Sequence, residues 1–560
     1  MGTADQAGRV RDGLAMGLLA VLGAGIPLGL ATVAGAIGLP HNDDWVYIQG
    51  AEALLHSGSI AMSGHNAAAI GQLVLVQPLL WLSAGATWAY TAFGLAAAAI
   101  SVAATYALAR FYLPPAQAIL APILLLVFPG FLRESASFMT DGPALALALL
   151  SLLAGIGWLR GGRRALLVAS LGLGIAGASV REFDVVAPLA VVGTAWLRTI
   201  RLDHRRLLIL LSASLALVGA ATVVAAARAS APTDTPVATT TLRILLVGPT
   251  MTTLAAVLLP LTMVAFSRWR DRLRATTVVA GIGVVGVALL VPTVRPLIGQ
   301  TWASNGLAGD ALLDGVRTQV IGPLPWSLTE ELAILGAVLA ASLVVAWATT
   351  LQVADRPATG ELESLGAFVR SDSLTLVLFL SGYAAAVVVS AAAAVGPFDR
   401  YLYPMVPAAA ILLAQGTDDF WRPGRVQLAS HLALLWLGVS AVMIATNSFA
   451  FDVARWQAGE AAVGLGYQAQ AVDAGYEWVG THAPGQPKQT LRDHKLTWYD
   501  DVLLAEPPCA VVSSSRLTTP GFVLLSANVA SYRQYLLMGP VEPLYLYGAA
   551  GPGCPVPTVP

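Results

Sequence analysis

Long apolar segments recur along most of this chain and restrict the folds that are open to it. Hydrophobic residues make up 56% of the 560 residues and charged residues only 11%, less than half of the charged fraction of about 25% in ordinary soluble domains. A helix needs about 20 apolar residues to cross a bilayer. The pattern predicts an all-α, multi-pass membrane protein and excludes a soluble enzyme. The net charge of -1 gives no basic surplus for binding nucleic acid.

We count thirteen candidate membrane-spanning segments, which all lie before residue 450. They are 13–38, 84–109, 117–132, 142–159, 165–181, 184–197, 207–227, 243–266, 275–292, 327–351, 373–395, 401–416 and 429–448. Residues 450–560 are more polar and are punctuated by Gly and Pro, which predicts a small α/β domain after a membrane domain at 1–449. Cys509 and Cys554 both lie there. An oxidising compartment would permit a disulfide between them, the alternative being two unpaired thiols.

The distribution of arginine predicts the orientation, because cytoplasmic loops are enriched in Lys and Arg. With the N-terminus inside, eighteen arginines fall in inner loops. Seven fall at outer ends, namely Arg133, Arg181, Arg228, Arg243, Arg295, Arg317 and Arg400. We therefore expect a cytoplasmic N-terminus and an extracytoplasmic C-terminal domain. The main outer loops are then 39–83, 133–141 and 293–326.

The first outer segment, 39–83, is too long for a turn and too polar to span a membrane. Its apolar residues Trp45, Ile48, Ala51, Leu54 and Leu55 recur at helical spacing, which predicts an amphipathic helix on the membrane surface. Residues 67–82 predict a second, half-buried helix.

Adjacent carboxylates, Asp43 and Asp44, open this surface helix. An Asp at this position commonly caps a helix, but one cap does not need two acids. Two acids in one short turn suit a general base and a neighbour that orients it or holds a cation. Acids at a membrane boundary usually have a function, so we favour this second interpretation.

Further charged residues are expected at the same side of the membrane. Asp141 precedes Gly142 and Pro143 and could be either a helix cap or an active-site acid. Two other boundary segments combine acids with arginines, Arg181-Glu182-Phe183-Asp184 and Asp399-Arg400-Tyr401. Arginine binds phosphate well, and carboxylate can activate a nucleophile. Together they predict a site for an anionic lipid head group at the outer interface.

These motifs resemble those of the GT-C glycosyltransferases, in particular the branch with protein O-mannosyltransferases and the lipid A aminoarabinose transferase. The resemblance rests on the acidic pair, the surface helices, "SFMTDGPALALALL" at 137–150, "SVREFDVVAP" at 179–188 and "DRYLYPMVPA" at 399–408. It implies a bacterial plasma-membrane enzyme. Such an enzyme transfers a sugar from a polyprenyl-phosphate donor to a glycan, lipid or protein acceptor outside the membrane, usually with inversion.

The resemblance also implies roles for individual residues. Asp44 or Asp43 would be the base, and Asp141 the acid of the second loop. Arg181 and Arg400, and more weakly Arg133, would contact the donor phosphate, with Tyr401, Glu182 and His65 near the substrate. The usual His-Pro-Pro stretch is not evident, and His65-Asn66 is at best its remnant. The resemblance implies no certain cofactor; a divalent metal, Mg²⁺ or Mn²⁺, is an open alternative that Asp43, Asp44 and Asp141 with His41 or His65 could hold.

Two alternatives remain open from the sequence. A flippase or transporter of lipid-linked sugars would also have many spans, but its charges should lie near the middle of the helices. A glycan polymerase or ligase would use a large late outer loop, and 293–326 with its charged residues could be that loop. Aromatic residues in 450–560, namely Trp456, Tyr476, Trp478, Trp498 and Tyr499, could stack on sugars, although most aromatics in a module of this size are core.

Overall fold

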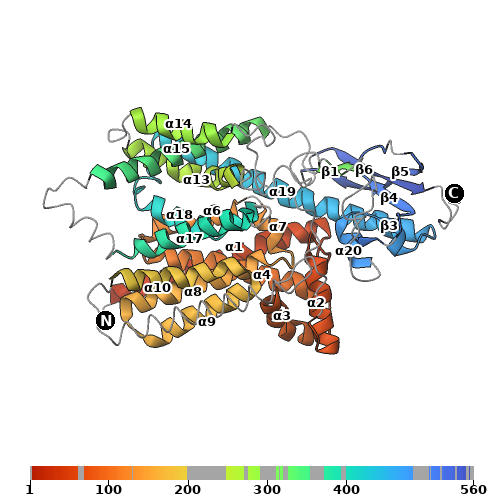
Figure 1. Ribbon diagram of the computed structural model, residues 1–560, viewed down its shortest axis with the longest axis horizontal. Coiled ribbons are helices and arrows are strands. Elements are labelled where there is room, and N and C mark those ends of the chain that lie inside the picture. Colours follow the sequence, from red (N-terminus) through yellow and green to blue (C-terminus); the bar gives the residue numbers. More distant parts are fainter. Residues whose placement is uncertain are drawn as a thin grey trace.

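The computed structural model is mainly helical, with a small sheet near the C-terminus (Figure 1). It describes residues 3–60, 69–128, 130–198, 247–269, 275–289, 311–313, 316–318, 326–353, 371–392, 399–482, 503–504, 506–517, 520–535, 539–549 and 554. The expected architecture, a polytopic helical protein with a small C-terminal α/β part, is confirmed. His65 and the segment 207–227 lie outside the described residues.

The helices form one bundle, with most of the long ones roughly parallel to its long axis (Figure 1). The long helices are α1 (Thr3–Ala34), α4 (Trp88–Arg110), α8 (Asp141–Gly161), α9 (Arg164–Val180), α10 (Val186–Arg198), α13 (Val247–Trp269), α14 (Ala275–Leu289), α15 (Trp326–Val353), α17 (Ser373–Ala392), α18 (Met405–Ala414) and α19 (Arg425–Gly464). The short ones are α5 (Pro115–Ala118), α6 (Leu120–Leu126), α7 (Phe131–Ser135), η1 (Glu182–Val185) and η3 (Asp399–Leu402). Buried aromatic side chains such as Phe128, Phe379 and Tyr403 fill the centre.

Six of the described helices are long and apolar enough to cross a membrane. They are Val10–Ala34, Trp88–Arg110, Asp141–Gly161, Thr250–Arg268, Ser373–Ala391 and Arg425–Gly464. Several other helices are apolar but shorter, and the total of thirteen spans stays a prediction. The segment 117–132, expected as one span, is divided instead into parts of α5, α6 and α7. Gly130, with φ of 81°, takes the left-handed conformation between α6 and α7, which is incompatible with a continuous helix.

The two helices expected in 39–83 are confirmed, and their position on the membrane surface stays a prediction. They are α2 (Asp44–Ser57) and α3 (Ile70–Leu82), which pack together and against α4 through Tyr47, Ala51, Leu73 and Tyr90. They lie at the end of the bundle that also holds the C-terminal sheet (Figure 1). We call this the site end, and the opposite end, where α1 begins, the far end.

The C-terminal part begins as an extension of the bundle. α19 continues unbroken for 40 residues, across the boundary at 449/450 expected from the sequence, because residues 450–464 contain no Pro and bury an apolar face. It is followed by η4 (Ala469–Ala471), β3 (Val472–Asp473), α20 (Tyr476–His482), β4 (Ala510–Ser513), β5 (Phe522–Arg533) and β6 (Val541–Ala549).

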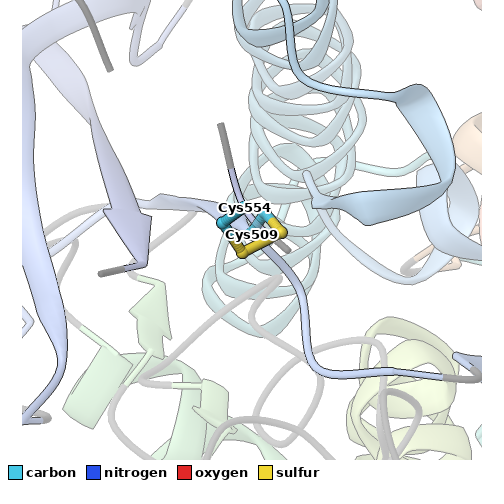
Figure 2. Close-up of a disulfide and its surroundings, with 2 residues drawn as sticks. All are labelled: Cys509 and Cys554. Carbon is cyan, nitrogen blue, oxygen red and sulfur yellow. A yellow bond between two sulfur atoms is a disulfide. The ribbon is translucent and has the colours of Figure 1, made fainter. Parts of the chain in front are cut away.

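The C-terminal sheet has the strand order β3-β4-β6-β5. β3 and β4 are parallel, with Val472 opposite Ala510, whereas β6 is antiparallel to both β4 and β5. Cys509, directly before β4, forms a disulfide with Cys554 beyond β6 (Figure 2). A separate two-stranded hairpin, β1 (Ala311–Leu313) and β2 (Val316–Thr318), lies in the expected loop 293–326, most of which is outside the described residues.

Candidate active site

Two acidic residues stand at the starts of helices at the site end. Asp43 is at the N-cap position of α2, and Asp141 is the first residue of α8. Neither helix has a side-chain cap hydrogen bond at its N-cap residue, so capping does not account for these carboxylates. Both acids instead turn toward arginines from other parts of the chain.

The carboxylate of Asp141 lies between two guanidinium groups. Its Oδ1 accepts a short hydrogen bond from Nη1 of Arg181, at the C-terminal end of α9. Its Oδ2 is 3.7 Å from Nε of Arg400, in η3. Arg400 also reaches Asp43, with 3.6 Å between Nη2 and Oδ2. The structure thus brings together four of the predicted site residues, two acids and two arginines, from segments far apart in the sequence.

Tyr401 supports the arginines. The guanidinium carbon of Arg181 lies 4.1 Å from the centroid of its ring, a distance typical of a cation–π contact. Tyr401 itself is only 7% exposed. The structure places the Tyr401 ring beneath the guanidinium of Arg181, and its expected contact with substrate stays a prediction.

Asp44 has surroundings very different from those of Asp43. It is 1% exposed, and its Oδ2 accepts backbone N–H bonds from His41 at 3.1 Å and from Phe138 at 2.9 Å. Burial raises the pKa of Asp44 to about 7, although His41 and the two backbone bonds act in the opposite direction. Asp43, with a side chain 19% exposed, is the more accessible of the adjacent acids. Asp44 joins the start of α2 to the loop before α8.

The loop that carries Phe138 is also placed by contacts with α3 and α4. Gln72 of α3 donates to the carbonyl of Phe138, and the Phe138 ring packs against Tyr90 of α4, with 4.9 Å between ring centroids. At Gly94 of α4, a Cβ atom would collide with the backbone carbonyl of Ser137. A small residue there lets the loop lie directly on α4, and so fixes the position from which α8 and Asp141 start.

Arg133 belongs to a second buried network rather than to the pair of arginines around Asp141. Its Nη1 is 3.5 Å from Oε1 of Glu134, and its Nη2 is 3.8 Å from Oδ2 of Asp452 in α19. The same oxygen of Asp452 is 2.8 Å from Nδ1 of His41. Burial raises the pKa of Glu134, which is partly offset by the charges of Arg133 and Arg400. Glu134 therefore interacts electrostatically with both networks.

A third set of contacts comes from the C-terminal part. The hydroxyl of Tyr476 donates to Oδ1 of Asp43 at 3.0 Å, and the backbone N–H of Asn42 donates to Oε1 of Glu477 at 2.9 Å. Neither Asp452 nor Glu477 is among the site residues predicted from the sequence. Their one visible signal is that each is an acid within a mostly apolar stretch, "FAFDVARW" and "GYEWVG".

The other expected site residues contribute less. Glu182 follows Arg181 directly and is half-buried in η1, and its charge acts on Arg181. Trp478, one of the aromatics considered for sugar stacking, is 3% exposed and packs in the C-terminal core, so that interpretation is wrong for this residue. Trp498 and Tyr499 lie outside the described residues.

No group of three or more His, Cys, Asp or Glu side chains is arranged to hold a metal ion in the part of the chain that the structure describes. The carboxylates considered as metal ligands have other contacts there. Asp43 and Asp141 face arginines, and one oxygen of Asp44 is occupied by backbone N–H groups. This arrangement does not fit a Mg²⁺ or Mn²⁺ site, which needs several oxygen ligands around one point.

No protein-family model matches this chain, and a search of curated proteins finds no match either. Among solved structures it is similar to ArnT from Cupriavidus metallidurans in the apo state, with 14% identity over 79% of this chain and 78% of that chain and a TM-score of 0.33. For ArnT bound to undecaprenyl phosphate the identity is 11%, over 96% and 99%, with a TM-score of 0.35.

A second similar protein is the oligosaccharyltransferase AglB from Archaeoglobus fulgidus, in complex with an inhibitory peptide and a dolichol-phosphate. The identity is 11%, over 77% of this chain and 58% of that chain, with a TM-score of 0.36. ArnT and AglB are GT-C glycosyltransferases, the class that the sequence motifs resemble. At TM-scores this low, the matches are likenesses alone, and the proposal that follows rests on the residues of this chain.

Proposed function

We propose that this chain is a membrane glycosyltransferase of the GT-C type. It moves a sugar from a polyprenyl-phosphate donor to a hydroxyl or amine of a glycan, lipid or protein acceptor, with inversion at the sugar. The site end of the bundle would face the extracytoplasmic side, as the distribution of arginine in the sequence predicts.

The observation that carries this proposal is the convergence of Arg181 and Arg400 on the acids at the starts of α2 and α8. These charges lie at one end of a bundle whose helices are long and apolar enough to cross a membrane. Buried charges are costly, and at membrane boundaries they usually mark a function. Two arginines beside an apolar bundle suit a ligand that joins a phosphate to a lipid tail.

In the proposed reaction Asp43 is the general base. It accepts the proton of the acceptor hydroxyl while the acceptor oxygen forms a bond to the anomeric carbon of the sugar. The bond between that carbon and the phosphate oxygen breaks, and its electron pair leaves with polyprenyl phosphate. Arg181 and Arg400 stabilise the negative charge that develops on the leaving phosphate.

We favour Asp43 over Asp44 as the base because of their different contacts. Asp44 is nearly inaccessible and one of its oxygens accepts two backbone hydrogen bonds. Asp43 is partly exposed and lies next to Arg400, so a hydroxyl bound near it would also be near the phosphate. Asp141 would hold the two guanidinium groups apart and in place.

The proposal can be tested with purified protein in lipid nanodiscs. Undecaprenyl-phosphate hexoses and pentoses would be supplied with a panel of acceptors, and released undecaprenyl phosphate and the glycosylated product would be followed by mass spectrometry. We expect transfer from one donor. The variant Asp43→Asn should lose it by roughly 10²- to 10⁴-fold, the usual contribution of a general base.

Asp12→Asn is the matched control, because it also neutralises one acid of an Asp–Arg pair, with Arg110, but at the far end. It should transfer sugar at the wild-type rate. Absence of transfer from every donor, together with movement of lipid-linked sugar across the bilayer, would instead favour a flippase. Full activity of Asp43→Asn with no activity of Asp44→Asn would reassign the base.

A further inference from the structure

The short segment that carries the proposed base is held by the C-terminal part of the chain. Three hydrogen bonds join α20 to the start of α2. Tyr476 donates to Oδ1 of Asp43 at 3.0 Å, Glu477 accepts from the backbone of Asn42 at 2.9 Å, and the carbonyl of Gly480 accepts from Nε2 of Gln49 at 3.1 Å. The residues that these bonds join are more than 400 positions apart in the sequence. The bonds hold particular groups of the α2 segment in place, so the C-terminal part does more than cover the site.

Glu477 is itself fixed by the end of α19. Its Oε2 accepts a hydrogen bond of 2.7 Å from Nη2 of Arg455, which also donates to Oδ1 of Asp452 at 2.6 Å. Asp452 in turn holds Nδ1 of His41 at 2.8 Å. Residues 41 and 42, which precede the base, are therefore attached to α19 by two separate routes.

Packing reinforces the hydrogen bonds. Trp45 is buried against Tyr476, with ring centroids 5.7 Å apart in an edge contact, and lies in one apolar cluster with Val479 and Leu503. At Gly480 a Cβ atom would collide with the indole of Trp45. Absence of a side chain at this position lets α20 approach α2 closely enough for these hydrogen bonds to form.

The backbone before Asp43 also needs an external support. Asn42 has a φ of 54°, in the left-handed region that most residues avoid. A residue in such a conformation persists only where its surroundings hold it there. The bond from its N–H to Glu477 is one such restraint, and it acts directly on the residue before the base.

We propose that Tyr476 is a positioning residue for Asp43, and that Glu477 fixes the backbone from which Asp43 projects. This inference rests on the proposed function, in which Asp43 is the base. The C-terminal part thus completes the active site by orienting the acid, through the hydrogen bond from the phenol of Tyr476 to its carboxylate. Among the described residues, Arg400 from η3 and Tyr476 from α20 face this carboxylate, and it also acts electrostatically on Tyr47 of α2 and Tyr401 of η3.

Tyr476→Phe is the first test, because it removes the hydrogen bond and keeps the ring on Trp45. We expect kcat to fall about 10-fold, the effect of losing one hydrogen bond to a charged group, with little change in the KM for the donor. A phenol that donates to a carboxylate favours its charged form, so the acidic limb of the pH profile should move to higher pH. Tyr467→Phe is the matched control, since the Tyr467 hydroxyl is buried without a hydrogen-bond partner among the described residues. It should leave both readouts unchanged.

Glu477→Leu provides a readout that is independent of activity. Amide hydrogen exchange of residues 41–49 should speed up in this variant by at least 10-fold, while Glu477→Gln, which keeps an oxygen acceptor for Asn42, should restore slower exchange. The inference is overturned if Tyr476→Phe has the kcat and pH profile of the wild type, or if exchange does not change in Glu477→Leu. A wild type without transfer activity would overturn the proposed function, and the exchange data would still decide whether α20 holds this segment.

Discussion

The two ends of the helical bundle use the same kinds of charged residue in different ways. At the far end, Asp12 pairs with Arg110, and Asp372 pairs with Arg160 and Arg198, through side chains that are 20% to 39% exposed. At the site end, the side chains of Asp141 and Arg400 are 2% and 9% exposed. Each of these two buried groups has more than one oppositely charged partner, as the more exposed Asp372 also has at the far end.

This difference in exposure distinguishes ion pairs at the solvated surface from ion pairs that form a site. Exposed pairs contribute little to stability, about 0 to 1 kcal/mol each, and need no purpose beyond solvating the ends of helices. Buried pairs pay a desolvation cost that their mutual attraction often fails to repay. The acids and arginines at the site end therefore point to a ligand, and matched variants at the two ends can break or sharpen this comparison.

The largest difference is expected between Arg400→Lys and Arg198→Lys. Lysine keeps the charge but lacks the planar, multiple donors that suit phosphate. Arg400→Lys should raise the KM for the lipid donor by about 10- to 100-fold, the loss of one or two charge-assisted hydrogen bonds. Arg198→Lys, at the far end, should leave this KM unchanged. If steady-state transfer kinetics gave the same donor KM for Arg400→Lys and Arg198→Lys, the site end would not differ from the far end in donor binding.

Stability should respond to pH with opposite signs at the two ends. Burial raises the folded-state pKa of Asp44 to about 7, above the unfolded value of about 3.9. Its contribution is therefore fully present below about pH 4 and is lost as the pH rises through 7. Burial acts to raise the pKa of Asp372 too, but hydrogen bonds from Arg198 and Arg160 lower it overall. The contribution of Asp372 is lost as the pH falls.

Thermal unfolding between pH 4 and 8 measures this difference. Asp44→Asn should flatten the loss of stability between pH 5 and 8, by a few kcal/mol at most, because one pKa unit corresponds to about 1.4 kcal/mol. Asp372→Asn should change only the acidic side of the curve. An unaltered slope above pH 5 in Asp44→Asn would show that this carboxyl does not titrate in the expected range.

A smaller effect is expected at Tyr401, which supports Arg181 rather than the acids. Tyr401→Leu keeps an apolar side chain but removes the ring face below the guanidinium. A contact of this kind contributes about 1 to 2 kcal/mol where it is desolvated, so donor affinity should fall by about 5- to 30-fold. Titration calorimetry with undecaprenyl phosphate measures it. Tyr112→Leu is the far-end control, because Tyr112 lies 5.8 Å from Arg160 and should not alter affinity.

The smallest effect is expected from removing the far-end pair itself. Arg160→Gln breaks an exposed pair with Asp372 and should cost about 0.2 to 1 kcal/mol of stability, with no effect on transfer. Denaturation in detergent and the transfer assay would check both. A loss of activity in this variant would show that the far end also takes part in the function.

The sequence predicted the helical class, the two surface helices and the side-by-side placement of Asp43, Asp141, Arg181 and Arg400 in space. Those inferences depend on hydrophobic length, periodicity and the sidedness of charge, which are local properties. It could not separate Asp43 from Asp44, because their difference arises from Phe138 and His41 backbone groups. Nor could it connect Tyr476 and Glu477 with Asp43, since no local pattern records a contact across more than 400 residues.

Because α19 is continuous, the position of Asp452 along and around the helix depends on the number of residues that precede it. At about 1.5 Å per residue its 40 residues extend about 60 Å, twice the thickness of a bilayer core. The same helix thus packs within the apolar bundle and, near its C-terminal end, places Asp452 in contact with His41. Inserting a single residue just before Asp452 would rotate it by about 100° around the axis and turn it away from His41. Insertions and deletions should therefore be tolerated in surface loops. They should not be tolerated between Arg425 and Arg455, where each would change the direction in which the following side chains point from the helix.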